Sequence, residues 1–139
     1  MKNNLHLTLV FLGEVEPGDV DPIIKALDNV EYKKFDISFN MLGKFSRRDG
    51  DIVWLGMDKE NSDLARLNNL VCRELGKLGF RQEKFTPHIT LGRRVVLKED
   101  LASIQADGIS TRVERISLML SERVDNVLTY TEIYSKNLH

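Results

Sequence analysis

The sequence predicts an α+β fold with mainly antiparallel sheet, and three observations lead to that class. Several stretches alternate apolar and polar residues, which is typical of strands with one buried face. Two longer stretches repeat apolar residues at helical spacing. Short turns link the strands in pairs, with no linker or low-complexity stretch between them. At 139 residues, 42% of them hydrophobic, the chain is expected to form a single domain over residues 1–139.

The first elements are a strand and a helix. Residues 5–13 alternate in the manner of a strand. After a loop, Asp21 can cap a helix whose first turn suits Pro22. The apolar face of this helix consists of Val20, Ile23, Ile24, Leu27 and Val30.

The middle of the chain predicts two strands and the longest helix. Residues 35–42 alternate, and residues 52–57 form the next strand, which is expected to pair antiparallel with the one before. A polar loop covers residues 43–51 between them. The helix spans residues 62–78, with Gly79 as its C-terminal stop. Its apolar face consists of Leu64, Leu67, Val71, Leu75 and Leu78.

The last part of the chain predicts three strands and a short helix. A strand covers residues 85–96 and a short helix residues 98–104. Strands at 112–121 and 127–135 follow, joined by a turn at Asp125-Asn126. The full order is therefore β-α-β-β-α-β-α-β-β.

Two of these strands carry the same short motif. His6 and Thr8 stand on the first strand, and His88 and Thr90 on the strand at 85–96. Because side chains alternate along a strand, each pair shares the face opposite its apolar neighbours. The recurrence predicts two similar lobes in one compact unit, with both motifs at one spot if the two strands lie side by side.

The motif residues match a particular chemistry. Two imidazoles near neutral pKa can act as base and acid in one reaction. Two hydroxyls can donate hydrogen bonds to an oxyanion between them. The set suits attack of water on a phosphodiester. A single His-x-Thr on a strand is usually an ordinary packed or solvent-facing pair, but two copies in the same strand phase favour a site.

Composition narrows the class of protein. The net charge of −1 argues against a protein that coats long nucleic acid through bulk electrostatics. A lone cysteine, Cys72, cannot form an internal disulfide and lies in an apolar helical pattern, so we interpret it as a small core residue. No apolar run approaches a membrane span, and a soluble, cytoplasmic protein is expected.

Basic residues cluster at two places. Lys44, Arg47 and Arg48 lie in one predicted loop, and Arg93 and Arg94 follow the second motif. The first cluster is interpreted either as a solvated turn or as a small basic site.

Residues 5–14, LHLTLVFLGE, and residues 85–93, FTPHITLGR, resemble the two motifs of the two-histidine (2H) phosphoesterases. The resemblance is greatest to the bacterial and archaeal RNA 2′,3′-cyclic phosphodiesterases, also called 2′-5′ RNA ligases. It runs from residue 3 to near the end of the chain and includes the strand around 53–56.

The resemblance implies a bilobal α+β fold with mainly antiparallel sheets, helices on the outside and a central cleft that carries both motifs. It implies His6 and His88 as catalytic residues, with His88 assigned as base and His6 as acid. Thr8, Thr90 and Arg93 would bind the phosphate. The substrate would be an RNA 3′ end or nucleotide with a 2′,3′-cyclic phosphate, opened by water to a 2′-phosphate. Reversible 2′-5′ ligation is the second reaction that the resemblance implies. No cofactor and no metal are implied, because the set lacks the third protein ligand of a catalytic zinc site.

Three aromatic side chains could stack on a base. Trp54 lies in a run that is apolar on both faces, which favours core packing. Phe11 and Phe45 are the other candidates, with core or loop packing as the alternative.

The resemblance also includes one departure. Family members usually have an extra strand and helix before the first motif, whereas this chain opens on MKNN and the motif. The absence of that strand is expected to expose a sheet edge, and we expect the edge to be covered or to pair in a homo-oligomer. The alternative function is a non-catalytic or weakly active binder of RNA ends or cyclic nucleotides.

Overall fold

The computed structural model describes residues 6–46, 48, 50–57, 59–81, 84–95 and 109–139. Within these ranges the helices are α1 (Val20–Asp28), preceded by a 3₁₀ turn at Pro17–Asp19, and α2 (Ser62–Gly76). The strands are β1 (Phe35–Phe39), β2 (Met41–Phe45), β3 (Asp51–Gly56), β4 (His88–Val95), β5 (Ile109–Val113), β6 (Arg115–Val124) and β7 (Val127–Asn137). All pairings between these strands are antiparallel, which confirms the predicted α+β class with antiparallel sheet.

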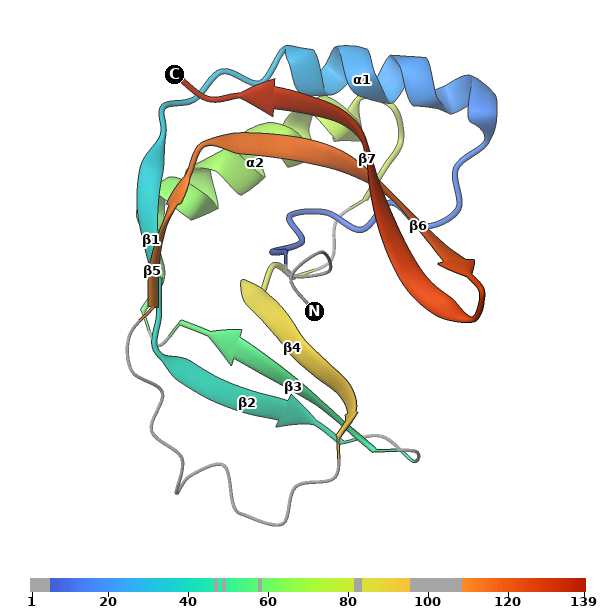
Figure 1. The fold of residues 1–139 in the computed structure, drawn as a ribbon. Coiled ribbons are helices and arrows are strands. Elements are labelled where there is room, and N and C mark those ends of the chain that lie inside the picture. Colours follow the sequence, from blue (N-terminus) through green and yellow to red (C-terminus); the bar gives the residue numbers. More distant parts are fainter. Residues whose placement is uncertain (1–5, 47, 49, 58, 82–83, 96–108) are drawn as a thin grey trace.

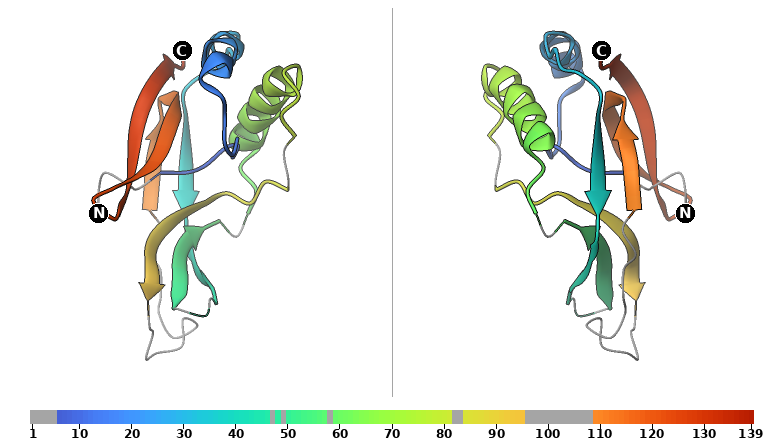
Figure 2. Two further views of the ribbon diagram at one scale, coloured as in Figure 1. Left: turned by 90° about the vertical axis from the view of Figure 1, so that its right-hand side faces the viewer. Right: turned by 90° about the vertical axis from the view of Figure 1, so that its left-hand side faces the viewer.

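The elements form two parts. The pairs β1–β5 and β6–β7 lie together with both helices, and the sheet β2–β3–β4 lies apart from them (Figure 1). The side views show α1 and α2 on one face of the layer formed by β1, β5, β6 and β7 (Figure 2). The chain at residues 6–12 passes between the two parts (Figure 1).

The core fills the space between the helices and that layer. The predicted apolar face of α2 is buried from Leu64 to Leu75, and it packs in one cluster with Ile37 and Phe39 of β1. Leu78 is 42% exposed, because α2 ends at Gly76 and the helical spacing no longer applies to it. The predicted cap is also wrong in detail: α1 begins at Val20, so Asp21 lies inside its first turn.

β5 and β6 form one long extended segment that is interrupted only at Glu114. The strand predicted at 112–121 is therefore longer than expected and is divided in two. The division has a cause in the pairing, because β1 pairs with β5 and β7 pairs with β6. Glu114 stands where one partner strand gives way to the other, and its carbonyl accepts a 2.8 Å hydrogen bond from the Leu138 N–H.

The strand predicted at 35–42 is divided in the same way. β1 and β2 belong to different sheets, and the chain passes from one to the other at Asn40. The Asn40 N–H donates to the Gly56 carbonyl at 3.0 Å. β2 includes residues 43–45, so the loop predicted at 43–51 is shorter than expected, and the predicted antiparallel pairing with β3 is confirmed.

The strand predicted at 5–13 is wrong as a regular strand. Among the described residues, Leu7 makes a single antiparallel bridge with Ile89. The backbone then bends at Leu9, which breaks the alternation. Phe11 is 82% exposed for this reason, although the pattern places it on the same face as Leu7 and Leu9.

The later elements largely follow the prediction. β4 begins at His88 and ends at Val95, so residues 85–87, which were predicted as part of this strand, lie outside it. The helix predicted at 98–104 lies outside the described residues. The turn between β6 and β7 is confirmed, with positive φ values of 51° at Asp125 and 64° at Asn126, as a two-residue hairpin of type I′ requires. No described helix is both long enough and apolar enough to cross a membrane.

Candidate active site

The bridge between Leu7 and Ile89 sets the relation between the two motifs. In an antiparallel pair, a step along one strand corresponds to a step back along the other. His6 therefore stands opposite Thr90 and Thr8 opposite His88 in the register. The two histidines are diagonal neighbours, a separation of roughly 7–8 Å in antiparallel sheet.

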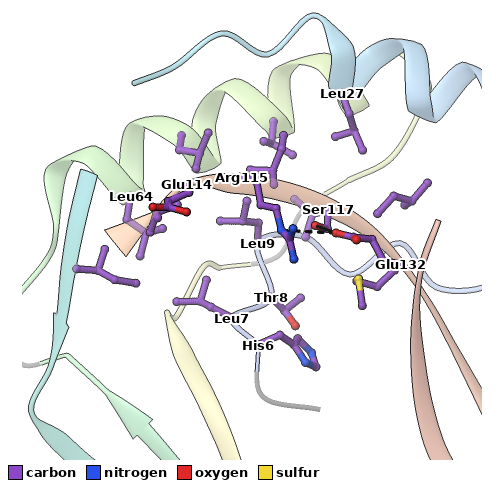
Figure 3. A pocket seen from close by; sticks show the side chains of 18 of the residues that line it. His6, Leu7, Thr8, Leu9, Leu27, Leu64, Glu114, Arg115, Ser117 and Glu132 are labelled. Carbon is purple, nitrogen blue, oxygen red and sulfur yellow. Dashed lines mark hydrogen bonds and ion pairs between the residues drawn. The ribbon is translucent and has the colours of Figure 1, made fainter. Parts of the chain in front are cut away.

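The two sides of residues 6–9 differ in character. The side chains of His6 and Thr8 point to one side, and those of Leu7 and Leu9 to the other (Figure 3). Leu7, Leu9 and Ile89 pack against the core. By strand alternation, His88 lies on the face of β4 opposite Ile89, the same side as His6 and Thr8.

A buried polar side chain anchors this stretch to α2. Asn68 is only 5% exposed, and its Nδ2 donates a 2.9 Å hydrogen bond to the Leu9 carbonyl. A buried amide is stabilising only when it has a partner, so this bond fixes the chain just after the first motif. Asn68 lies in the predicted helix, but nothing in its spacing pointed to this contact.

The imidazole of His6 contacts an aromatic ring of β7. The ring centroids of His6 and Tyr130 lie 4.4 Å apart, with an interplanar angle of 62°. Edge-to-face contacts of this kind limit rotation of the imidazole about its side-chain torsions. No sequence signal pointed to Tyr130, because it lies in the last predicted strand, far from both motifs.

The imidazole of His88 has one nitrogen fixed by the backbone. Nδ1 of His88 lies 2.8 Å from the carbonyl oxygen of Thr86. A carbonyl can only accept, so Nδ1 carries the proton and donates it. In the neutral ring, Nε2 is then the nitrogen that can accept a proton.

The ring of Trp54, from β3, lies beside the ring of His88, from β4. The two rings make an edge contact with centroids 6.3 Å apart. Trp54 is half-buried and is not part of the main core. Its indole lies over Gly43 and Gly56, where a Cβ on either glycine would collide with the ring. The glycines therefore leave the space that holds the indole beside His88.

The remaining predicted site residues are described only in part. Thr8 is exposed beside His6, whereas the side chains of Thr90 and Arg93 lie outside the described part of the structure. Lys44 and Arg48 are exposed, and Arg47 lies outside the described residues.

The other candidate groups can be placed in the same way. The side chain of Phe45 lies outside the described part. Cys72 is half-buried, and this burial raises the pKa of its thiol, in keeping with a residue that is not a nucleophile. Within the described ranges, no three His, Cys, Asp or Glu side chains are grouped to hold a metal ion.

A cavity of about 940 Å³ begins beside His6 and Thr8. It extends between residues 6–12 and the segment β5–β6, over apolar side chains of α1 and α2 (Figure 3). Polar side chains also line it, and three of them interact: Glu132 accepts a hydrogen bond from Ser117 at 2.5 Å and lies 3.7 Å from the Arg115 guanidinium. His88 is not among its lining residues, so most of this cavity lies away from the pair of histidines.

Comparison with known proteins finds one family model and several relatives. The family model described as the 2′-5′ RNA ligase superfamily matches residues 2–125. An RNA 2′,3′-cyclic phosphodiesterase of Archaeoglobus fulgidus is 45% identical over 92 residues, covering 65% of this chain and 52% of the relative. One of Escherichia coli is 33% identical over 93 residues, covering 66% of this chain and 52% of the relative. The chain thus spans about half the length of the curated relatives it matches.

Solved structures match over nearly the whole chain. Escherichia coli LigT in complex with 3′-AMP superimposes with a TM-score of 0.83 at 28% identity, covering 99% of this chain and 79% of that one. A crystal structure described as a phosphoesterase gives a TM-score of 0.82 at 29% identity, covering 97% of this chain and 77% of that one.

Proposed function

The chain belongs to the 2′-5′ RNA ligase superfamily, and from this membership and the placement of its two motifs we propose that it hydrolyses 2′,3′-cyclic phosphates on RNA ends or nucleotides. The proposed product carries its phosphate on the 2′ oxygen. The relatives in Archaeoglobus fulgidus and Escherichia coli are RNA 2′,3′-cyclic phosphodiesterases by name, which supports this substrate class.

The single observation that carries the proposal is the antiparallel bridge between Leu7 and Ile89. It brings two segments more than eighty residues apart into one register, with His6 and His88 on the same side. A diagonal separation of roughly 7–8 Å leaves room for a phosphate between the two imidazoles. An acid and a base on opposite sides of the phosphorus suit in-line displacement by water.

The proposed roles follow from the hydrogen bonds. His88 is the base, because its Nδ1 proton is held by the Thr86 carbonyl and Nε2 can take a proton from water. His6 is the acid and returns a proton to the 3′ oxygen as the P–O3′ bond breaks. The bond that forms joins the water oxygen to phosphorus, so the product is a 2′-phosphate with a free 3′ hydroxyl.

Three further residues complete the proposed site. The Thr8 and Thr90 hydroxyls donate to the non-bridging oxygens, where negative charge increases in the transition state. Arg93 adds a positive charge at the phosphate. The same groups run the reverse reaction, ligation to a 2′-5′ linkage, by microscopic reversibility. We also propose that the protein is located in the cytoplasm, as its composition predicts.

Turnover of a 2′,3′-cyclic mononucleotide tests the proposal. We expect hydrolysis in the presence of a chelator, a rate that peaks between two apparent pKa values, and a 2′-phosphate product. His6→Ala and His88→Ala should each lower turnover by about a hundredfold or more. Lys25→Ala on the exposed surface of α1 serves as the control variant.

Other outcomes would contradict particular parts of the proposed function. Activity lost in chelator would replace the acid–base scheme with a metal site. A 3′-phosphate product would mean that the substrate lies the other way round between the histidines. Binding of the nucleotide without any turnover would favour the alternative, a non-catalytic binder of RNA ends.

A further inference from the structure

The two histidines and Trp54 lie in a row across one face of the small sheet. The stretch that carries His6 bridges one edge of β4, and β3 pairs with the other edge, where Gly56 is the partner of His88. Residues 6–12, β4, β3 and β2 therefore follow one another in that order (Figure 1). Because side chains two apart along a strand share a face, Trp54 lies on the same face as Gly56 and His88. The order across the sheet is His6, His88 and then Trp54.

The indole of Trp54 lies flat on this face. A Cβ on Gly43 or on Gly56 would collide with its six-membered ring, so the ring covers both glycines. Gly43 is the partner of Trp54 on β2, which means that the ring spans two strands. Trp54 is half-buried. Since the glycines cover one side of the ring, its exposed part lies on the side away from the sheet.

Apolar surface continues beside the indole. Met41, the partner of Gly56 on β2, shares this face and is 41% exposed. The ring of His88 makes its edge contact with Trp54 on the β4 side, with centroids 6.3 Å apart. An aromatic ring that is supported on one side by the backbone suits stacking of a nucleobase, because every base has a π-face.

The proposed chemistry determines which nucleobase reaches the indole. The phosphate lies between the two histidines, and the 3′ oxygen leaves with its ribose on the side of His6. The nucleophile is on the side of His88, and Trp54 lies beyond His88. In hydrolysis the nucleophile is water, which carries no base. In ligation it is the 5′ hydroxyl of a second RNA, and the first nucleoside of that RNA then lies next to Trp54.

We propose that Trp54 stacks on the nucleobase of the strand whose 5′ hydroxyl attacks, and that it thereby binds the second RNA of 2′-5′ ligation. In this step His88 takes the proton of the 5′ hydroxyl and the bond between O5′ and phosphorus forms. The P–O3′ bond breaks, and His6 protonates the 3′ oxygen. Cleavage of a 2′-5′ linkage is the same step in reverse. This inference rests on the proposed function and adds to it a site for the second substrate.

Two ligands that differ by one nucleoside test the proposal. The 2′-5′-linked diadenosine monophosphate has a nucleoside on each side of its phosphate, whereas adenosine 2′-phosphate lacks the nucleoside attached through its 5′ oxygen. Trp54 is the single tryptophan of the chain, so the intrinsic tryptophan fluorescence reports on this indole alone. We expect the dinucleotide to quench the fluorescence and adenosine 2′-phosphate to change it little. His6→Ala is used for the titration, because it should bind the dinucleotide without cleaving it.

Two variants at position 54 separate stacking from support of His88. In the His6→Ala chain, Trp54→Leu should lower the affinity for the dinucleotide, relative to that for adenosine 2′-phosphate, by about fivefold or more, the scale of one stacked base. Trp54→Phe keeps an aromatic face and should retain most of this preference. Calorimetry measures both ligands on each variant. A disturbed His88 would weaken both ligands alike and leave the ratio of their affinities unchanged.

Several results would overturn the proposal. These are binding of the dinucleotide without quenching, equal quenching by the two ligands, no binding of the dinucleotide, and an unchanged affinity ratio in folded Trp54→Leu. Should Trp54→Leu not fold, the quenching by the two ligands decides the question. Hydrolysis of a 2′,3′-cyclic mononucleotide by the parent chain is measured in parallel. Turnover together with equal quenching would contradict this inference alone, whereas absence of turnover would contradict the proposed function.

Discussion

The ring of Tyr130 stands edge-on to the imidazole of His6, with the two centroids 4.4 Å apart. Tyr130 comes from β7 and His6 from the stretch that precedes α1, so the contact joins opposite ends of the chain. A proton donor must be held in a fixed orientation to act in a transition state. Tyr130 is thus placed to hold the acid that we propose.

Tyr130→Leu should lower turnover by about tenfold, because the imidazole loses its aromatic neighbour and samples more orientations. KM should change little, since Tyr130 holds His6 and is not proposed to bind substrate. Tyr130→Phe keeps the ring and should retain most of the activity. Steady-state kinetics on a 2′,3′-cyclic mononucleotide measure both variants, and equal loss in the two would assign the effect to the hydroxyl.

Asn68→Ala should destabilise the fold and also impair turnover. The substitution takes the Asn68 amide away from the carbonyl of the half-buried Leu9, at a cost of about 1–3 kcal/mol in the free energy of unfolding. The stretch with His6 and Thr8 then loses its anchor to α2. Asn69→Ala is the matched control, because Asn69 is the exposed neighbour in the same helix. Denaturant unfolding measures both variants, and an equal change in the two would rule out the proposed anchor.

Much of the architecture could be predicted, because the helical apolar spacing of α2 depends on local sequence alone. Leu64, Leu67 and Leu75 were assigned to one face by spacing, and all three are buried. The break at Asn40 could not be predicted in this way. Alternation shows that a stretch is extended, but it does not show where the stretch leaves one partner strand for another.

The candidate site could be proposed from the sequence only as far as the two motifs themselves. His6, Thr8 and His88 follow from the repeated pattern, and the Leu7–Ile89 bridge brings the two stretches together as expected. Their supporting groups come from elements without any such repeat. Tyr130 and Asn68 reach the first motif through tertiary packing, and neither has a sequence signal that distinguishes it from its neighbours.

Glu31→Gln should make stability less dependent on pH at both ends of the range. The hydrogen bond from Lys136 lowers the pKa of the Glu31 carboxyl, and a smaller contribution comes from His139. The same hydrogen bond to Glu31 raises the pKa of the Lys136 ammonium. A lowered carboxyl pKa stabilises the fold above its ordinary value of 4.5, and this stabilisation is lost as pH falls through the folded value. The raised pKa of Lys136 stabilises the fold below its ordinary value of 10.5 and is lost as pH rises through the folded value.

Thermal unfolding from acid to alkaline pH measures this effect. The difference in thermal stability between the parent chain and Glu31→Gln should be greatest at pH values between the ordinary pKa values of Glu31 and Lys136. It should become smaller toward each end of the pH range. Glu16→Gln, at another exposed position, is the charge-matched control. A difference that stays constant across the whole range would show that the pairing with Lys136 does not depend on ionisation.

Gly43→Ala should disturb His88 through Trp54. A Cβ at position 43 would collide with the indole of Trp54, and overpacking of this kind costs about 1–3 kcal/mol in stability. Because the indole contacts the His88 ring, its displacement should also lower turnover, and the resonances of the His88 ring should shift in NMR spectra.

Gly76→Ala is the matched control for this prediction. A Cβ at Gly76 would meet nothing within 4 Å, and the position lies in the last turn of α2. Alanine favours a helix over glycine by up to about 1 kcal/mol, so this variant should be as stable as the parent chain or more so. Its activity should be unchanged, because Gly76 is exposed at the end of α2 and is not one of the candidate site residues. If Gly43→Ala kept full activity and an unshifted His88 ring, Trp54 would not be what positions the proposed base.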